Sequence, residues 1–527
     1  MHDSHDSHGN TTHPIVAIAH GRLRGTRGPI GLSFRGIPYA APTGGANRFQ
    51  APRPVVPWSG VRDALHCGHR CPQQHEHIAR APVLRWYGQT EHYGEDCCVL
   101  NVFTPAADGA RRPVLVYLHG GGYITGGSGG AVLDGSRLAA FGDVVVVTLN
   151  HRLNLFGHLD LGHLAPERFG DAANAGLLDL VAALGWVREH IAGFGGDPGR
   201  VTLFGQSGGG SKIMCLLAMP AARGLFHRAI NMSGTTGTTL VDASTTQPFT
   251  DDLLAHLGVA PERLDALLEL PAETLIKARS AVLRKRKEGS RPVPDGRHLF
   301  ASPMDPASLP LHAGVPLMIG STRTEASFYF APDPRHFEIS EAQLRARVRA
   351  QFGLDDAGAA AVLASFRADD PARTPAQTLI ALMSETVFRS SILRAAEAKA
   401  AAGAAPVYLY NLAWPAPVEG GRWGTPHTMD IPLAFGTVDH ATELLGDGPE
   451  SDRVAHHLMT AFVAFARTGV PAGPGLPEWP AFDAARRATL VIDRDCRVVD
   501  DYLAGDRRAG AVLRMDPLDR KALLTFH

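Results

Sequence analysis

The sequence has few cysteines, no long hydrophobic run and no excess of either charge. Its 527 residues include only six cysteines, too few for a disulfide scaffold in a chain of this length. The longest aliphatic run, residues 144–149, is far shorter than the roughly 20 residues that a transmembrane helix needs. Residues 1–13 contain no apolar stretch of the kind that a secretory signal requires. These absences predict a cytoplasmic protein with no membrane partner.

Acidic and basic residues are nearly balanced, with 51 lysines and arginines against 52 aspartates and glutamates. A nucleic-acid-binding protein usually has a clustered basic surface and a pI above about 9. The short basic run at residues 284–287 lies in an otherwise balanced chain, and we interpret it as solvated surface. The composition, with 45% hydrophobic residues, is typical of a globular protein and argues against nucleic acid as a partner.

Two groups of metal-binding residue types are present, and neither has the spacing of a metal site. Residues 1–13 are predicted to be a disordered, histidine-rich tail in which metal binding is incidental; its histidines are His2, His5, His8 and His13. Cys67 and Cys71 have histidines beside them, but no second ligand pair follows at the distance found in zinc fingers. The sequence therefore predicts no metal site.

Short β-branched runs in the first half of the chain are followed by glycine-rich or polar loops. Residues 114–118, 144–149 and 200–204 are predicted strands, and residues 173–187 carry apolar residues at helical spacing. This alternation predicts an α/β fold with a large, mostly parallel central sheet flanked by helices. Such sheets bind ligands outside the carboxyl ends of their strands. The loops after these three strands are therefore the first places to look for chemistry.

No internal repeat or linker divides the chain, so residues 14–527 are predicted to form a single catalytic domain. Residues 235–310 mix threonine-rich loops with short helical patterns and are interpreted as an insertion over the sheet. The region 339–402 is predicted to form lid-like helices, because its alanine-rich segments 339–364 and 374–402 have the composition of long helices.

The turn after the third strand has the pattern of a nucleophilic serine. Ser207 lies in the sequence Gly205-Gln206-Ser207-Gly208-Gly209, and a helical pattern follows up to Pro220. A serine on a sharp strand-to-helix bend needs glycine neighbours, because the bend leaves no room for neighbouring β-carbons. The flanking strand and helix make this motif far more specific than its five residues alone, and they predict Ser207 as a nucleophile.

A second glycine-rich loop follows the first strand. His119-Gly120-Gly121-Gly122 has the pattern of an esterase loop whose backbone N–H groups bind the oxyanion of the tetrahedral intermediate. With the amide after the nucleophile, the predicted donors are Gly121, Gly122 and Gly208.

These two loops, together with motifs spread over nearly the whole chain, resemble the type-B carboxylesterase family, which includes cholinesterases and bacterial para-nitrobenzyl esterases. The further matches are residues 34–40 (FRGIPYA), 95–101 (EDCCVLN), 195–198 (GGDP) and 479–480 (WP). The resemblance implies the α/β-hydrolase fold, with helical insertions over the active site. It also implies a serine esterase that uses no metal and no organic cofactor.

The resemblance implies the other two members of a catalytic triad. Glu325, in residues 320–328, matches the acid of the family, although Ala326 stands where the family usually has glycine and a slightly different turn is expected. His427, in residues 424–436, matches the base. The chain order Ser207, Glu325, His427 is that of α/β-hydrolases. Ser233 resembles a serine that lies near the triad histidine.

Further implications of the resemblance are structural. Cys71 and Cys97 match a pair that forms a disulfide in exported relatives, with Cys67 and the adjacent Cys98 as competing partners, and a reducing cytosol disfavours that bond. Buried ion pairs are implied in two places, Arg48 with Glu95 and Arg152 with Asp179.

Departures from the family concern the substrate. Gln206 stands where cholinesterases have a glutamate that favours a cationic alcohol group, and Trp86 and Tyr87 lie near the position of an aromatic residue that binds quaternary ammonium. Without that negative charge, we expect hydrolysis of a neutral, moderately hydrophobic small-molecule ester through an acyl-enzyme intermediate. The same residues also serve carbamate or amide hydrolysis, and acyl transfer or cyclisation in a biosynthetic pathway; a non-catalytic binding module is a third alternative. The sequence indicates no oligomeric state.

Overall fold

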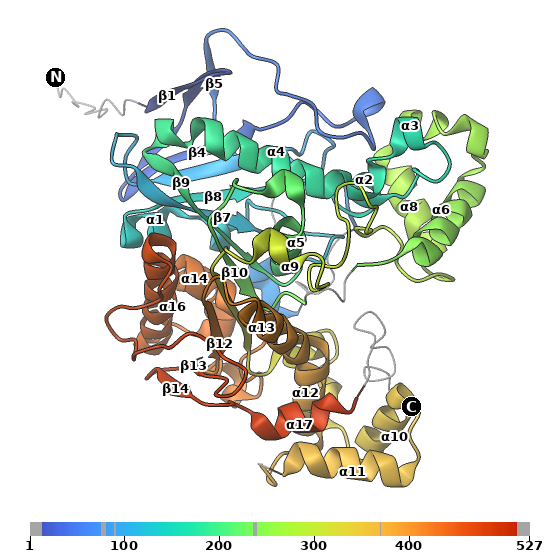
Figure 1. The fold of residues 1–527 in the computed structure, drawn as a ribbon, viewed down its shortest axis with the longest axis vertical. Coiled ribbons are helices and arrows are strands. Elements are labelled where there is room, and N and C mark those ends of the chain that lie inside the picture. The colour runs from blue at the N-terminus through green and yellow to red at the C-terminus, as the bar shows by residue number, and fades with distance from the viewer. Residues whose placement is uncertain (1–12, 75–80, 89–90, 236–239, 369, 514–527) are drawn as a thin grey trace, which may run out of the picture.

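The computed structural model describes residues 13–74, 81–88, 91–235, 240–368 and 370–513 (Figure 1). Residues 1–12 of the predicted histidine-rich tail lie outside these ranges. Within them, no helix has both the length and the apolar character needed to cross a membrane.

An 11-stranded sheet forms the centre of the molecule, in the order β14-β13-β12-β11-β10-β9-β7-β8-β6-β4-β3. Its strands are β3 (Thr26–Gly28), β4 (Gly31–Pro38), β6 (Val99–Thr104), β7 (Arg112–Leu118), β8 (Val145–Leu149), β9 (Gly196–Gln206), β10 (Arg228–Met232), β11 (Leu317–Thr322), β12 (Val407–Leu412), β13 (Thr489–Ile492) and β14 (Arg497–Val499). The pairs from β13 to β8 are parallel, while β14, β6, β4 and β3 pair antiparallel. The predicted large, mostly parallel sheet is confirmed.

The strand order changes direction at β7. The chain passes from β7 to β8 on one side and then crosses to β9 on the other side of β7. In open α/β sheets, ligands bind in the crevice at such a reversal, at the carboxyl ends of the strands. The two glycine-rich loops, at residues 119–122 and 205–209, follow β7 and β9 and therefore meet at this point.

Side chains of β7 alternate between two cores, as the two-residue repeat of a strand requires. Val114, Val116 and Leu118 pack in the core that contains apolar residues of α4 (Ala175–His190), α5 (Gly208–Leu217) and α13 (Ser390–Ala402). Leu115 and Tyr117 pack in the opposite core, with α1 (Ser136–Gly142), α14 (Asp430–Phe435) and α16 (Pro449–Thr468). The sheet is therefore buried on both faces, which explains its continuous hydrophobic strands.

The alanine-rich region forms more helices than its composition predicts. Residues 339–364 were expected to be one long helix but form α10 (Glu341–Phe352) and part of α11 (Asp356–Arg367). Gly353 ends α10 with a φ of 64°, and the Asp355 side chain caps α11 by accepting from Gly358 N. Residues 374–402 form α12 (Pro375–Met383), a π-helical segment (Ser384–Arg389) and α13. The prediction of two long helices is thus wrong for the first segment, because a glycine and a cap divide it.

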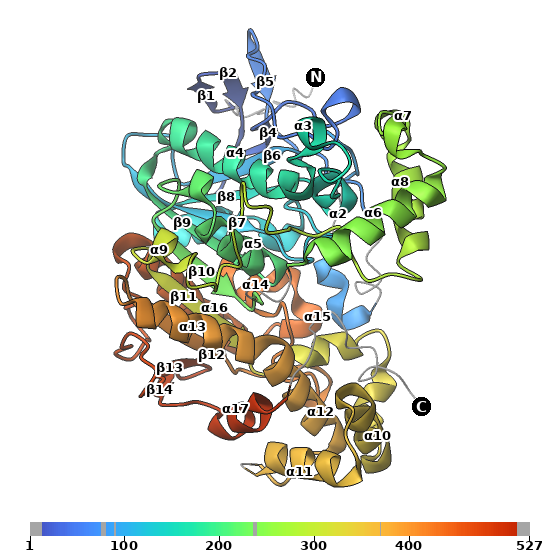
Figure 2. The same ribbon diagram turned by 45° about the vertical axis from the view of Figure 1, so that its right-hand side comes forward.

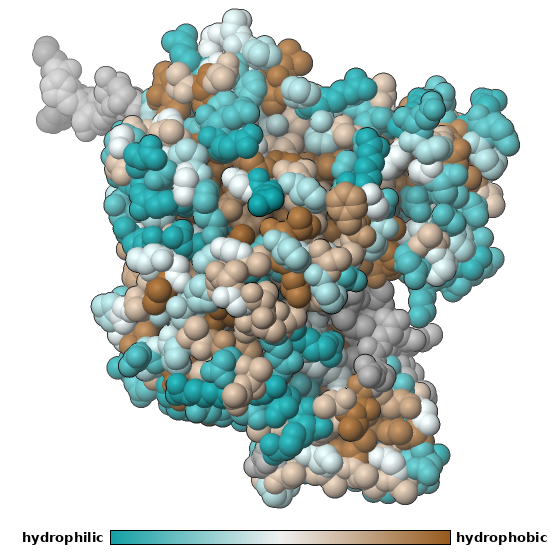
Figure 3. All heavy atoms as spheres, in the orientation of Figure 1, coloured by the Kyte–Doolittle hydropathy of each residue, from teal (hydrophilic) through white to brown (hydrophobic). Residues whose placement is uncertain are grey.

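The helices of residues 243–282 lie beside the sheet, at the right of Figure 1, whereas residues 309–312 lie near its centre. In the described part of residues 235–310, the helices are α6 (Ala243–Leu257), α7 (Ala266–Glu269), α8 (Ala272–Val282) and α9 (Leu309–His312). Apolar residues of α6, α7 and α8 share a core with α2 (Asn154–His158) and α3 (Pro166–Phe169). Hydrophilic residues cover much of this part of the surface (Figure 3).

Five further elements are labelled in Figure 2, three strands at its top, one helix near its middle and one near its bottom. They are the small sheet of β1 (Ile15–Ile18), β2 (Gly21–Arg24) and β5 (Val61–Asp63), and the helices α15 (Thr442–Leu445) and α17 (Ala504–Ala511). Sequence patterns did not predict this small sheet, because its strands have only three or four residues.

Candidate active site

Ser207 occupies a strained turn between β9 and α5. Its φ of 55° and ψ of −121° lie outside the regions that L-residues favour. The turn is held by a hydrogen bond from Ser207 N to Met232 O at 2.7 Å. Strain of this kind persists only when the surrounding structure enforces it, and it is found preferentially at functional sites.

Glycine is required beside Ser207 because the backbones of two loops approach closely. A Cβ at Gly208 would overlap the backbone of Gly122, and a Cβ at Gly209 would overlap the carbonyl oxygen of Leu118. Gly121 and Gly122 themselves have φ values of 83° and 65°, a region that side chains disfavour. The nucleophile turn and the glycine loop after β7 are thus packed backbone to backbone.

This packing brings together three N–H groups that are not otherwise used. Within the described ranges, the backbone N–H groups of Gly121, Gly122 and Gly208 donate no hydrogen bond. Backbone N–H groups that are fixed in place and unpaired are suited to stabilise a developing oxyanion. The three residues predicted as oxyanion donors therefore lie side by side with free donors.

Glu325 and His427 are brought together from the ends of β11 and β12. His427 Nδ1 and Glu325 Oε2 are 2.5 Å apart, and both side chains are buried. The second carboxylate oxygen, Oε1, accepts hydrogen bonds from Ser233 Oγ at 2.6 Å and from Thr322 N at 2.8 Å. A charged acceptor with three donors is fixed in orientation, so the imidazole bound to it is fixed as well.

The backbone also joins the two loops. His427 N donates to Glu325 O at 3.2 Å, and Thr324 N donates to Thr425 O at 3.2 Å. Ala326, where the family usually has glycine, does not have a positive φ. It lies in the first turn of the 3-10 helix Glu325–Phe330, and its N–H donates to Ser384 Oγ at 3.1 Å.

The side chain of Gln206 contacts the imidazole of His427, which the sequence did not predict. Its side chain is fully buried, and its Nε2 lies 3.2 Å from His427 Nε2 and 3.3 Å from Nδ1. Gln206 Oε1 is buried without a hydrogen-bond partner in the described part of the chain. The residue before the nucleophile therefore presents a neutral amide to the face of the imidazole.

A second carboxyl group lies buried close to Glu325. Asp430 is fully buried, and neither carboxyl oxygen has a hydrogen-bond partner among the described residues. Burial, and then repulsion from Glu325, raises the pKa of Asp430 well above its usual value. Its surroundings therefore favour the protonated carboxyl group, and sequence reasoning gave Asp430 no role because its burial has no local signature.

Aromatic rings surround the imidazole of His427. The ring centroids of Phe388, Phe328 and Tyr329 lie 4.7, 5.6 and 6.3 Å from that of His427. Tyr87 packs edge-on against Phe328 at 6.1 Å. Trp86 lies behind Tyr87 and is a buried anchor whose Nε1 donates to Val83 O at 3.1 Å.

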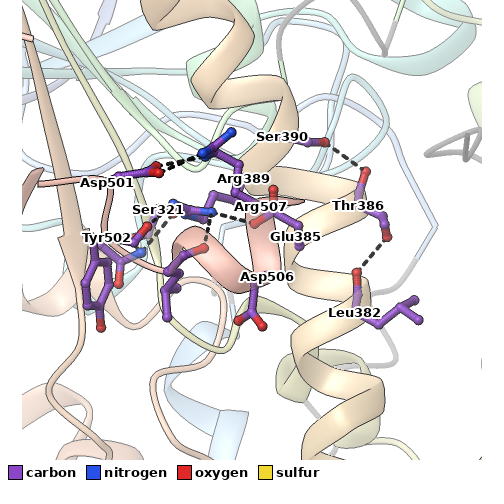
Figure 4. Close-up of polar contacts among 12 residues, drawn as sticks. Ser321, Leu382, Glu385, Thr386, Arg389, Ser390, Asp501, Tyr502, Asp506 and Arg507 are labelled. Carbon is purple, nitrogen blue, oxygen red and sulfur yellow. Dashed lines mark hydrogen bonds and ion pairs between the residues drawn. The ribbon is translucent and has the colours of Figure 1, made fainter. Parts of the chain in front are cut away.

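The π-helical segment Ser384–Arg389 supplies two of these contacts, Ser384 to Ala326 and Phe388 to His427. Within the segment, Glu385 and Arg389 form a buried ion pair, 2.7 Å apart (Figure 4). Arg389 also donates to the backbone oxygen of Tyr502. Sequence reasoning missed this segment, and π-helical turns are often found at functional sites.

All six cysteines are free thiols, so the Cys71–Cys97 disulfide implied by the resemblance is not formed in this structure. The two buried side chains are in hydrogen-bond contact, and this contact, with burial, raises the pKa of Cys97 well above its usual value. A thiol that does not ionise reacts slowly with oxidants.

Both implied ion pairs are present. Arg48 binds Glu95 through two hydrogen bonds of 2.7 and 2.5 Å, and Arg152 binds Asp179 through two of 2.8 and 2.5 Å. Within the described ranges, no group of three or more histidine, cysteine or acidic residues is arranged to hold a metal ion.

Comparison with known proteins matches the whole length of the chain. The sequence profile of a family described as the carboxylesterase family matches residues 12–508. The chain is 36% identical over 506 residues to the para-nitrobenzyl esterase of Bacillus subtilis (strain 168), with 93% of this chain and 97% of that protein covered. It is 36% identical over 511 residues to the phenmedipham hydrolase of Pseudarthrobacter oxydans, with 94% and 98% covered. A crystal structure of a Geobacillus stearothermophilus carboxylesterase superposes with a TM-score of 0.81 at 35% identity, covering 94% of this chain and 99% of that one.

Proposed function

The chain belongs to the carboxylesterase family, has the α/β-hydrolase fold and is a serine carboxylic-ester hydrolase, and from that premise we propose that Ser207, Glu325 and His427 are its catalytic triad. The observation that carries the proposal is the buried hydrogen bond of 2.5 Å between His427 Nδ1 and Glu325 Oε2. The strained turn of Ser207 and the free amides beside it support the same assignment.

His427 acts as the general base. Glu325 holds the proton of His427 on Nδ1, so the lone pair is on Nε2 and is available to the hydroxyl proton of Ser207. Ser207 Oγ then attacks the ester carbonyl carbon, and the carbonyl oxygen becomes an oxyanion. The N–H groups of Gly121, Gly122 and Gly208 stabilise that charge.

The tetrahedral intermediate collapses when its C–O bond to the alcohol breaks. His427 Nε2 gives the proton to the departing alcohol oxygen, which leaves the acyl group on Ser207. A water molecule then repeats the sequence, with His427 as base and Ser207 as leaving group, and the carboxylic acid is released. Glu325 stabilises the imidazolium that forms in both halves.

We propose that the preferred ester is neutral and moderately hydrophobic. Gln206 presents a neutral amide, and burial raises the pKa of Asp430, which favours its uncharged form. The rings of Phe328, Tyr329 and Phe388 supply apolar surface around His427.

One second activity is favoured by a specific relative, the 36%-identical phenmedipham hydrolase. We propose that phenmedipham is also a substrate of this chain. Release of its hydrolysis products by the wild type, and not by Ser207→Ala, is the expected result. A rate no greater than that of the buffer would exclude this activity.

We also propose that the protein acts in the cytoplasm, which its low cysteine content supports. Esterase activity that appears mainly in a periplasmic or secreted fraction of the cells would contradict this location.

The triad is tested by an organophosphate label followed by peptide mass mapping. We expect the label on Ser207 and a loss of about 10⁴-fold or more in kcat for Ser207→Ala. The matched control is Ser211→Ala, one turn further along α5, where a buried hydroxyl bonds Thr235 O at 3.1 Å; it should retain activity. A label on another serine, or full activity of Ser207→Ala, contradicts the assignment.

The substrate class is tested by kinetics with paired esters. We expect kcat/KM for acetylcholine to lie far below that for a para-nitrophenyl or naphthyl ester of a short acid. Gln206→Glu introduces the buried negative charge that cholinesterases have at this position. It should reduce the difference between kcat/KM for the neutral ester and kcat/KM for acetylcholine. A wild-type preference for acetylcholine contradicts the proposal.

A further inference from the structure

A fully buried lysine connects the nucleophile helix to both ends of the loop after β7. Lys212, in the second turn of α5, donates from Nζ to His119 O at 3.0 Å. The same Nζ lies 5.9 Å from the ring centroid of Tyr123. His119 immediately precedes Gly120–Gly122 and Tyr123 immediately follows them.

The surroundings of Lys212 contain no compensating charge. No carboxylate in the described part of the chain forms an ion pair with Lys212, and an unpaired buried ammonium is costly. The titratable groups that face it are His119 and Tyr123 in the loop after β7, His151 after β8, His158 in α2 and Cys215 in α5.

Burial shifts the pKa of Lys212 and of four of these neighbours toward the uncharged form. Burial lowers the pKa of His119 and of His151 well below its usual value, and that of His158 to about 3, with Lys212 as a further cause. Burial raises the pKa of Cys215 to about 11. Burial lowers the pKa of Lys212 itself to about 7. The pKa of Lys212 therefore lies near neutral pH, so its charge changes in that range.

We propose that Lys212 is a positioning residue: its ammonium group fixes the carbonyl of His119 and thereby holds the N–H groups of Gly121 and Gly122 toward the oxyanion. The inference rests on the proposed function, because it assigns Lys212 to the oxyanion site of that mechanism. Donors that are already oriented stabilise the transition state without reorganisation, and a charged donor holds a carbonyl more strongly than a neutral one.

The positive charge of Lys212 also stabilises the developing oxyanion directly. An ammonium group in a site without water interacts strongly with a negative charge that develops nearby. The pH dependence of kcat reports the pKa values of groups in the enzyme-substrate complex, and burial lowers the pKa of Lys212 to about 7. The wild type should therefore lose kcat on the alkaline side as Lys212 deprotonates.

The chain offers a matched control in Lys399. This lysine is also buried, in α13, and its Nζ donates to His312 O at 2.7 Å and Ala313 O at 3.2 Å. Burial lowers its pKa to about 8. Lys399 thus has the same chemistry as Lys212 and holds carbonyl groups at the end of α9, which belong to neither glycine loop.

The experiment compares Lys212→Met, Lys212→Gln and Lys399→Met with the wild type. It measures kcat and KM for a para-nitrophenyl ester across pH, and the inhibition constant of a trifluoromethyl ketone, which forms an oxyanion on the serine. We expect Lys212→Met to lower kcat and ketone affinity together by about 10²-fold, with KM changed by less than about threefold. Lys212→Gln should lack the alkaline decrease, and Lys399→Met should leave all three quantities near wild type.

Two results overturn the proposal. One is a kcat of Lys212→Met within about threefold of wild type; the other is a wild-type kcat that does not fall at alkaline pH, which needs no variant to fold. Organophosphate labelling distinguishes failure of the Lys212 proposal from failure of the proposed triad. A label that still maps to Ser207 leaves the triad intact when Lys212 fails, whereas a label elsewhere contradicts the triad itself.

Discussion

The two sides of the active site are held in place by different means. On the nucleophile side, backbone contacts fix Ser207: its N–H bonds Met232 O, and Gly208 and Gly209 touch the loop after β7 with no room for a Cβ. On the acid–base side, side chains add to the backbone hydrogen bonds: Ser233 Oγ donates to Glu325, and the ring of Phe388 packs against His427. Ser384 Oγ holds the backbone N–H of the neighbouring Ala326.

This difference determines how each side responds to substitution. Backbone contact at close range tolerates no added atom, because neither strand end can move without disturbing the sheet. On the acid–base side, several side-chain contacts together orient Glu325 and His427, so the loss of one contact leaves the others in place. Substitutions should therefore have severe effects on the nucleophile side and graded effects on the acid–base side.

The largest effect is expected for Gly209→Ala. The new Cβ overlaps Leu118 O and lies 3.1 Å from His119 O, so the loop that carries Gly121 and Gly122 must shift. Displacing one oxyanion donor costs about 10²-fold to 10³-fold in kcat. We expect a loss of that size in kcat for a para-nitrophenyl ester, with a lowered Tm.

The matched control is Gly185→Ala in the interior of α4, where an added Cβ meets nothing within 4 Å. This variant should gain up to about 1 kcal/mol in free energy of unfolding, since alanine favours the helix, and should keep wild-type kcat. Equal kcat for Gly209→Ala and Gly185→Ala would show that close backbone contact is not what holds the nucleophile side in place.

The same difference explains what the sequence predicted. Close backbone contact leaves a local signature, so glycines around a β-branched strand indicated Ser207 and the 119–122 loop without any relative. Glu325 begins a short 3-10 helix and His427 lies in a loop, and the local sequence of neither has such a requirement. Only the resemblance to a family selected them.

Other residues of the site had no signal in the sequence. The π-helical segment was hidden in an alanine-rich stretch that reads as a continuous helix, so the contact of Phe388 with His427 was not predicted. Lys212 and Asp430 are polar residues in helices, and such residues are usually exposed. Their burial follows from how distant segments pack, which residue order alone does not reveal.

Acid should destabilise the nucleophile side through its buried histidines. Burial lowers the pKa of His158 to about 3 in the folded protein, against about 6.5 in the unfolded chain. The stability is complete above the unfolded pKa and is lost as the pH falls toward the folded one, because the unfolded state binds the proton first. His158 alone should cost about 2 kcal/mol between pH 7 and about pH 5.

His158→Asn tests this assignment by chemical denaturation across pH. Its amide can donate to Ala173 O as His158 Nδ1 does at 3.1 Å, but it does not titrate. The loss of unfolding free energy on acidification should be smaller than in the wild type. If the variant loses as much unfolding free energy on acidification as the wild type, protonation of His158 is not a cause of the acid destabilisation.

A smaller effect is expected for Ser233→Ala on the acid–base side. The variant removes the 2.6 Å hydrogen bond to Glu325 Oε1 and leaves the one from Thr322 N. A hydrogen bond to a charged group contributes about 1.5–3 kcal/mol, and only part of this reaches the transition state. We expect kcat to fall about 10-fold with KM unchanged.

Ser327→Ala is its matched control, because Ser327 Oγ donates to Trp423 O at 2.6 Å rather than to the carboxylate. That variant should lose stability but keep kcat within about twofold. A loss of about 10³-fold in Ser233→Ala would mean that this side is no more tolerant than the nucleophile side.

The smallest effect on activity is expected for Thr428→Gly. This variant tests whether backbone strain also positions His427. Thr428 has a φ of 76°, unfavourable for a β-branched residue, and its buried Oγ1 has no partner in the described part of the chain. Glycine relieves strain of about 1–3 kcal/mol but loses about 0.5–1 kcal/mol through the freer unfolded chain. The free energy of unfolding should therefore rise by about 1 kcal/mol.

Activity should change little in this variant, because Glu325 and Phe388 still hold the imidazole. Thr428→Ala keeps the Cβ at the strained position and removes the unpaired hydroxyl together with the γ-methyl group, so its stability should lie between wild type and Thr428→Gly. Denaturant unfolding and kcat for one ester measure both quantities. If Thr428→Gly loses more than about 10-fold in kcat while Thr428→Ala does not, the strained backbone positions His427 as it positions Ser207. The two sides of the site would then share one means of support.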